Sequence, residues 1–143
     1  MRLALALLLH APAASAQEAP TLELRIQGVA STAGRILVAV FDRAEGFPGR
    51  AELAVHKVAV PAAVPTTTVR VEGLEAGRYA VVAVHDVNDN GALDVRAIIP
   101  IPKEPTGASR DARGRFGPPR FDDAVFELPP QGVHAESFSL VSL

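Results

Sequence analysis

GLEAGRYAVVAVHDVNDNGALD, residues 73–94, is the stretch on which the fold prediction rests. Its first half is a glycine-containing turn followed by an almost continuous apolar run, Arg78–Val84, which is typical of a buried strand. Tyr79 follows Gly77 by two residues, and we expect its hydroxyl to bond back to the preceding turn, as in a tyrosine corner. The second half places Asp and Asn at alternate positions around Gly91, which predicts a tight loop.

Similar short runs, separated by glycine and proline, occur along the rest of the chain, and no apolar stripe of helical period persists for three turns. The seven predicted strands are Leu22–Ile26, Arg35–Phe41, Leu53–Val60, Thr67–Val71, Arg78–Val84, Phe121–Leu128 and Ala135–Leu143. This spacing predicts an all-β fold, a single seven-stranded antiparallel β-sandwich of the immunoglobulin or transthyretin kind.

The break between Asp86 and Pro119 is longer than an ordinary connection, and such loops are usually functional. Five of its residues are prolines, so we expect no strand inside it. They are Pro100, Pro102, Pro105, Pro118 and Pro119.

The N-terminus has the pattern of a secretory signal peptide. Met1-Arg2 precedes the apolar run Leu3–Leu9, and the small residues Ala14-Ser15-Ala16 form a cleavage site. We therefore expect residues 1–16 to be removed and residues 17–143 to form one domain in the periplasm or outside the cell. The apolar run is well below the ~20 residues of a membrane span, so we expect no transmembrane segment after cleavage.

Composition excludes several classes of function. The 143-residue chain contains no cysteine, which excludes disulfides, thiol catalysis and thiolate metal sites. Its net charge of −2 does not provide the positive charge that binding to nucleic acid requires. We expect a monomer whose stability comes from its core and from a bound ion.

The acidic loop, residues 86–94, has oxygen-bearing side chains at positions 1, 3, 5 and 9. They are Asp86, Asn88, Asn90 and Asp94. With Gly91 at position 6, this matches the beginning of an EF-hand calcium loop, in which alternate residues direct hard oxygen ligands inward. Ala92 at position 7 would supply its backbone carbonyl. Position 12 is Ala97 rather than the bidentate Glu of an EF-hand, so a nine-residue loop closed by Asp94 is the closer pattern.

Two interpretations of this loop stay open. One is a Ca²⁺ site of modest affinity, with Glu104 and His85 as further candidate ligands. The other is a plain turn, in which Asp, Asn and Gly are present because they tolerate turn geometry. His85, Asp86 and Glu104 also allow a hydrolase hypothesis, although no recognisable nucleophile accompanies them. His56 and His134 stand singly on other predicted strands, which does not favour a zinc site.

Four motifs together resemble a bacterial exported family catalogued as domain of unknown function 2141. They are Gly77-Arg78-Tyr79-Ala80, the acidic loop preceded by His85, Pro102-Lys103-Glu104, and Phe116-Gly117-Pro118-Pro119 followed by Phe121, Asp123, Ala124 and Phe126. The resemblance implies a secreted or periplasmic β-sandwich with no established activity. The chain departs from the family pattern at Pro100, where glycine is usual, and in Thr106–Asp111, where aromatic residues are usual.

Four arginines form a further cluster in the long break. They are Arg110, Arg113, Arg115 and Arg120. They would suit an anionic glycan or lipid head group, or they belong to a solvated loop balanced by Asp111, Asp122 and Asp123.

These observations favour an exported, non-catalytic binding or structural module of the cell envelope, with an unknown envelope ligand or protein as its partner. A periplasmic hydrolase using His85, Asp86 and Glu104 is one alternative. An accessory subunit that binds another envelope protein through an open sheet edge is the other.

Overall fold

The computed structural model describes residues 19–92 and 104–142. The strands are β1 (Thr21–Gln27), β2 (Arg35–Phe41), β3 (His56–Pro61), β4 (Thr66–Val71), β5 (Gly77–Asp86), β6 (Thr106–Ala108), β7 (Phe126–Leu128) and β8 (Val133–Ser139). Short helical turns are η1 (Ala51–Leu53), η2 (Ser109–Asp111) and α1 (Phe121–Ala124). The predicted all-β class is confirmed. None of the described helices is long and apolar enough to cross a membrane.

Some sequence predictions fall on residues that the structure does not describe. The predicted signal peptide, residues 1–16, is one of them, and Asp94 and Ala97 of the proposed ion loop are others. Pro102 and Lys103 also lie outside the described residues.

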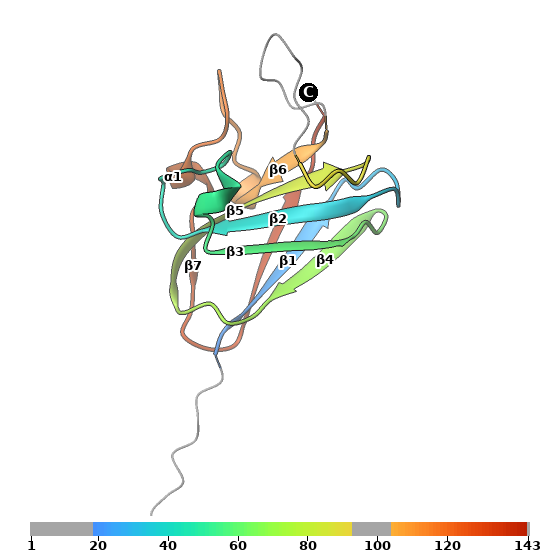
Figure 1. Cartoon of the computed structure of the whole chain (residues 1–143). Coiled ribbons are helices and arrows are strands. Elements are labelled where there is room, and N and C mark those ends of the chain that lie inside the picture. Colours follow the sequence, from blue (N-terminus) through green and yellow to red (C-terminus); the bar gives the residue numbers. More distant parts are fainter. Residues whose placement is uncertain (1–18, 93–103, 143) are drawn as a thin grey trace, which may run out of the picture.

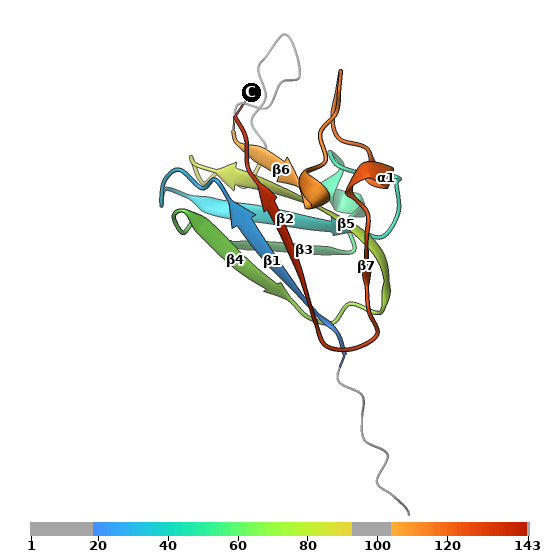
Figure 2. The same cartoon turned by 180° about the vertical axis from the view of Figure 1, so that it is seen from behind.

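The strands form two sheets that face each other across one core (Figures 1 and 2). The smaller sheet has the order β4-β1-β8, and the larger has the order β3-β2-β5-β6, with β7 also paired to β5. Both sheets contribute alternate residues to the core, for example Leu22, Leu24 and Ile26 from β1 and Val81 and Ala83 from β5.

β5 is apolar on both faces because both are covered. Its Val81 side faces the smaller sheet, while Ala80 lies on the outer face in a second cluster with Ala108 and Ala124. Phe47 and Phe121 pack against this cluster, and their rings meet edge to face at 5.9 Å. The unbroken apolar run in the sequence therefore reflects burial on both sides.

β6 lies inside the long break, where we expected no strand, and that prediction was wrong. Thr106–Ala108 contains no proline and pairs antiparallel with Val82–Val84. Pro105 has no N–H to donate, but its carbonyl oxygen accepts the His85 N–H at 2.9 Å, so it contributes to the pairing with β5 as an acceptor. The prolines of this segment therefore flank the strand without interrupting its hydrogen bonds.

The arrangement is also not purely antiparallel. β8 runs parallel to β1, with Thr21 opposite Val133 and Gln27 opposite Ser139. β7 pairs with β5 of the larger sheet, whereas β8 belongs to the smaller sheet. The chain therefore crosses between the sheets after β7, and β8 then runs beside β1 in the same direction. The described residues contain eight strands where seven were predicted.

Two predicted strands begin later than predicted, and the predicted Ala135–Leu143 strand is β8, which begins earlier, at Val133, and ends at Ser139. The predicted Phe121–Leu128 strand is the helical turn α1 followed by β7, because one turn of helix brings Phe121 and Ala124 onto the same small cluster. The predicted strand from Leu53 begins only at His56, after η1, and it ends on Pro61. A terminal proline is tolerated there because β3 is an edge strand.

Tyr79 is 7% exposed, and its hydroxyl donates a 2.7 Å hydrogen bond to the Glu75 carbonyl, as predicted. Burial raises the pKa of the Tyr79 phenol above its usual value of 10.0, and the negative charges of Asp42 and Glu75 raise this pKa further. The folded chain therefore holds the phenolic proton more tightly than the unfolded chain does.

Tyr79→Phe should lower the free energy of unfolding at neutral pH by about 1 kcal/mol, because the Glu75 carbonyl loses its donor. The raised pKa contributes stability that is fully present below pH 10.0 and is lost as the pH rises through the folded-state value. Tyr79 is the only tyrosine, so phenolate absorbance reports its ionisation directly. A Phe variant with the same alkaline stability curve as the wild-type chain would contradict this assignment.

Candidate functional site

The acidic loop begins at the end of the central strand β5. Asp86 is the last residue of that strand and is fully buried, while residues 87–92 are exposed. Both Asp86 carboxylate oxygens point into the loop: Oδ1 accepts the Asn90 N–H at 3.1 Å and Oδ2 accepts the Gly91 N–H at 2.7 Å. The carboxylate therefore holds the loop closed around itself.

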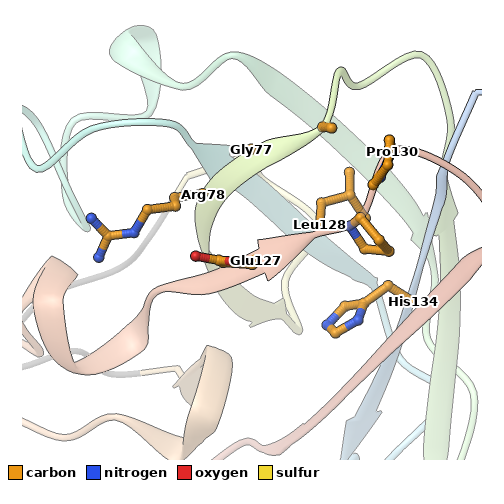
Figure 3. Close-up of a pocket in the computed structure, with 8 residues that line it drawn as sticks. Gly77, Arg78, Glu127, Leu128, Pro130 and His134 are labelled. Atoms are coloured by element: carbon orange, nitrogen blue, oxygen red, sulfur yellow. The ribbon is translucent and has the colours of Figure 1, made fainter.

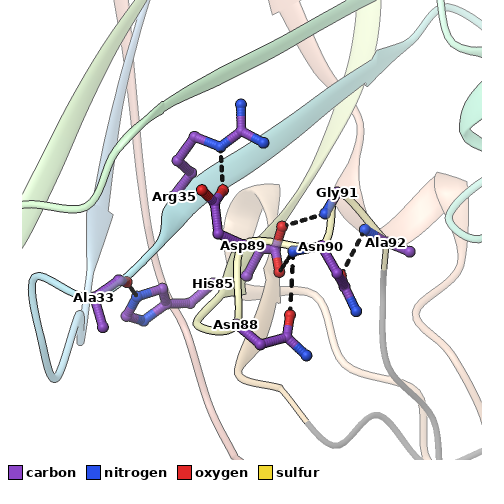
Figure 4. Close-up of polar contacts among 9 residues, drawn as sticks. Ala33, Arg35, His85, Asn88, Asp89, Asn90, Gly91 and Ala92 are labelled. Carbon is purple, nitrogen blue, oxygen red and sulfur yellow. Dashed lines mark hydrogen bonds and ion pairs between the residues drawn. The ribbon is translucent and has the colours of Figure 1, made fainter.

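The two asparagines continue the same pattern. Asn88 Oδ1 accepts the Asn90 N–H at 3.3 Å, and Asn90 Oδ1 accepts the Ala92 N–H at 2.9 Å (Figure 4). Alternate side-chain oxygens thus bond to backbone N–H groups further along the loop. This is the geometry of successive Asx turns.

The β1–β2 turn presses against the start of the acidic loop. Gly34 has φ +66°, and a Cβ placed on it would lie 1.9 Å from the Asp86 carbonyl oxygen. The next residue, Arg35, pairs with Asp86 in the β2–β5 register, and its Nε donates to Asp89 Oδ1. Asp89 therefore faces a guanidinium outside the loop, whereas the Asp86 carboxylate faces the loop interior.

His85 and Asp86 do not converge on one site. Successive residues of a strand point to opposite faces, so His85 lies on the core side of β5 and Asp86 on the outer side. His85 is 1% exposed, and its Nε2 lies 2.7 Å from the Ala33 carbonyl oxygen. This imidazole connects β5 to the β1–β2 turn.

Glu104 comes close to Asp86 through the β5–β6 ladder, although the two are far apart in the sequence. Val84 pairs with Thr106 and the His85 N–H reaches the Pro105 carbonyl, so the next position of the ladder places Glu104 across from Asp86. Both carboxylates are buried on the outer face, with 0% of Asp86 and 6% of Glu104 exposed.

Among residues 19–92 and 104–142, no group of three or more His, Asp or Glu side chains is arranged to hold a metal ion. Hydrogen bonds within the loop bring together Asp86, Asn88, Asn90 and Ala92. The β5–β6 ladder brings Glu104 to the same end of β5, and His85 lies apart on the other face of the strand.

The sequence model of a bacterial protein family, described as uncharacterized protein conserved in bacteria (DUF2141), matches residues 24–136. The chain belongs to the DUF2141 family. This confirms the resemblance drawn from the four motifs. Neither the curated proteins nor the solved structures include a match.

One polar residue that holds the DUF2141 fold together was missed by sequence reasoning. Ser109 is fully buried; its Oγ donates to the Ala124 carbonyl at 2.6 Å and accepts the Val81 N–H at 2.9 Å. It thereby attaches η2 and α1 to the central strand. A serine after a Gly-Ala pair looks like an ordinary loop residue, so the sequence carries no signal for this role.

An open hollow lies at the opposite end of β5 from the acidic loop in this DUF2141 chain (Figure 3). Its lining includes Gly77, Arg78, Glu127, Leu128, Pro130 and His134. The His134 ring stacks on Phe126 with centroids 5.4 Å apart, and its Nε2 lies 2.9 Å from Glu136 Oε1. His134 is thus held by packing and by one carboxylate, and it does not extend the acidic-loop site.

Proposed function

We propose that this chain is an exported, non-catalytic binding or structural module of the cell envelope, and that its acidic loop binds Ca²⁺ with modest affinity. The observation that carries the calcium proposal is the buried Asp86 carboxylate, whose two oxygens are fixed toward the loop interior by the Asn90 and Gly91 N–H groups. A carboxylate at position 1 is one of the ligands that such a loop uses.

We also propose that the two facing sheets are a β-sandwich of the immunoglobulin or transthyretin kind. The chain passes repeatedly between the two sheets, since β1, β4 and β8 belong to the smaller sheet while the strands between them belong to the larger. The Tyr79 bond to Glu75 has the form of a tyrosine corner. An experimental structure in which the strands of the two sheets cross near 90° would contradict this, because aligned sandwiches stay within about 30°.

The ligand count predicts weak binding. Asp86, Asn88 and Asn90 supply one carboxylate and two amide oxygens, Ala92 a carbonyl, and Asp94 and Glu104 further carboxylates. Because the exposed loop offers only a small number of charged ligands, we expect a Kd of ~10⁻⁴ M for Ca²⁺. At this Kd, ~1 mM Ca²⁺ adds about 1.4 kcal/mol to the free energy of unfolding. The ion would then brace the loop and the segment that follows it.

The test is a thermal melt of residues 17–143, stripped with chelator and then measured with millimolar Ca²⁺ or Mg²⁺. We expect Ca²⁺ to raise the melting temperature by about 5 °C. We expect a smaller rise with Mg²⁺, which demands a tighter octahedral site. Equal melting in all three buffers would mean that the loop is a plain turn.

Two variants locate the ion. Asn90→Ala should abolish most of the Ca²⁺-dependent rise because it removes an inward-facing oxygen. Asp89→Asn is the matched control, since its carboxylate faces Arg35 and not the loop interior. A calcium response that disappears equally in both variants would assign the effect to general charge in the loop.

The hydrolase alternative has less support. His85 reaches the Ala33 carbonyl on the core side of β5, away from the two outer-face carboxylates. A general base must reach the proton that it removes, and the imidazole nitrogen within hydrogen-bond distance is already occupied by main chain.

A further inference from the structure

The Phe116 loop, residues 112–120, carries the most exposed large apolar side chain among the described residues. Phe116 is 99% exposed. The neighbouring aromatic residues of the same sequence motif are not: Phe126 is 4% exposed, and Phe121 is partly buried against the Ala80 cluster. Phe116 therefore makes no contribution to the core that its neighbours build.

The loop holds this side chain away from the body of the protein. The orange segment between η2 and α1 projects beyond both sheets in the two opposite views (Figures 1 and 2). Its base is narrow, because a Cβ on Gly114 would lie 1.7 Å from the Gly117 carbonyl oxygen. The backbone thus closes directly beneath Arg115 and Phe116, which form a two-residue tip.

The charge of the loop has one sign. Residues 112–120 contain Arg113, Arg115 and Arg120 and no acidic residue, and all three arginines are exposed. Within residues 19–92 and 104–142, none of the three forms an ion pair, whereas Arg25, Arg35, Arg43, Arg50 and Arg70 all do. The nearest acidic residue on the η2 side, Asp111, accepts the Ser139 N–H.

These features fit a membrane surface better than a protein partner. A stable protein–protein interface buries roughly 800 Å² on each partner, which a two-residue tip does not offer. A bilayer interface accepts a single apolar side chain and attracts each basic residue independently. Arg113 lies three residues from Phe116 and Arg115 next to it, so their backbones are within about 11 Å of it, close to one Debye length.

We propose that the Phe116 loop docks this protein onto bilayers that contain anionic phospholipid, with Phe116 inserted at the interface and Arg113 and Arg115 against the lipid phosphates. Binding is reversible and weakens as salt is added, because most of it is electrostatic. This proposal does not depend on the acidic loop, and membrane docking requires no bound ion.

The test is co-sedimentation of the folded chain, residues 17–143, with vesicles of phosphatidylglycerol and phosphatidylcholine in equal parts, against vesicles of phosphatidylcholine alone. We expect binding to the anionic vesicles only. Arg113→Gln and Arg115→Gln should each weaken it about fivefold, and Phe116→Ala by a similar factor. Val133→Ala, which removes another exposed apolar side chain, and Arg70→Gln, which removes a paired arginine, are the matched controls.

A spectroscopic variant tests insertion itself. The chain has no tryptophan, so Phe116→Trp places a single reporter at the tip. Its emission should shift to the blue with anionic vesicles and be quenched by brominated lipid. Absence of vesicle binding, unchanged binding by Phe116→Ala, or an unshifted emission would each overturn the proposal. Equally tight binding to a soluble polyanion that depends on the arginines but not on Phe116 would also overturn it, in favour of plain anion binding.

Discussion

Gly34→Ala should lower the free energy of unfolding by about 3 kcal/mol or more, measured by urea denaturation. The new Cβ would lie 1.9 Å from the Asp86 carbonyl oxygen and 2.9 Å from the Val87 carbonyl oxygen. Both neighbours are backbone atoms of the central strand and of the acidic loop, so no side-chain rotation relieves the clash. The β1–β2 turn must move away, and the 2.7 Å contact between His85 Nε2 and the Ala33 oxygen is lost with it.

Gly73→Ala separates this clash from ordinary backbone strain. Gly73 also has a positive φ, +84°, but a Cβ there meets nothing within 4 Å. We expect this control to lose about 1 kcal/mol, the cost of the left-handed conformation for a residue with a side chain. Equal losses in the two variants would mean that Gly34 is required for its φ angle and not for the contact with Asp86.

Asp86→Ala should lower stability by about 2–4 kcal/mol even in chelator. The carboxylate accepts the Asn90 and Gly91 N–H groups, and hydrogen bonds to a charged acceptor contribute about 1.5–3 kcal/mol each before the cost of burying the charge is subtracted. If Asp86 served only as a calcium ligand, the variant would matter only when calcium is bound. The structure assigns Asp86 a role in closing the loop without any ion.

The calcium proposal predicts that Asp86→Ala loses further stability when calcium is present, in addition to the loss in chelator. In ~1 mM Ca²⁺ the gap between wild type and Asp86→Ala should widen by about 1 kcal/mol. Asp89→Ala is the comparison, since its side chain is 55% exposed and its pair with Arg35 contributes at most about 1 kcal/mol. A gap of the same size with and without calcium would leave Asp86 as a structural residue only.

Local sequence pattern predicted much of the two sheets because the physical signal is local. β2 has the predicted bounds, and β1, β4 and β5 extend the predicted ranges by one or two residues. Each of these strands presents mostly apolar side chains to the core at every second residue, and the run Ala80–Val84 of β5 is apolar on both faces because both are covered. The Tyr79 bond to Glu75 was also predictable, since its partner lies only four residues away.

The errors concern segments whose conformation depends on distant partners. β6 is three residues long and exists because β5 offers it a free edge, which composition and proline content do not reveal. The helical turn α1 forms where Phe121 and Ala124 reach the Ala80 cluster. The parallel pairing of β8 with β1 follows from the crossing between sheets.

The acidic loop shows the same division. The spacing of Asp86, Asn88 and Asn90 around Gly91 determined a tight loop with inward oxygens, because hydrogen bonds between residues two to five positions apart form it. Tertiary structure decided that Asp86 is buried, that Gly34 presses on it and that Glu104 lies opposite. The alternation of apolar residues along a strand and the hydrogen bonds of a turn involve only neighbouring residues, so they can be predicted from the local sequence. Burial, close backbone approach and strand neighbours depend on where the rest of the chain lies, so they arise only once the sheets have assembled.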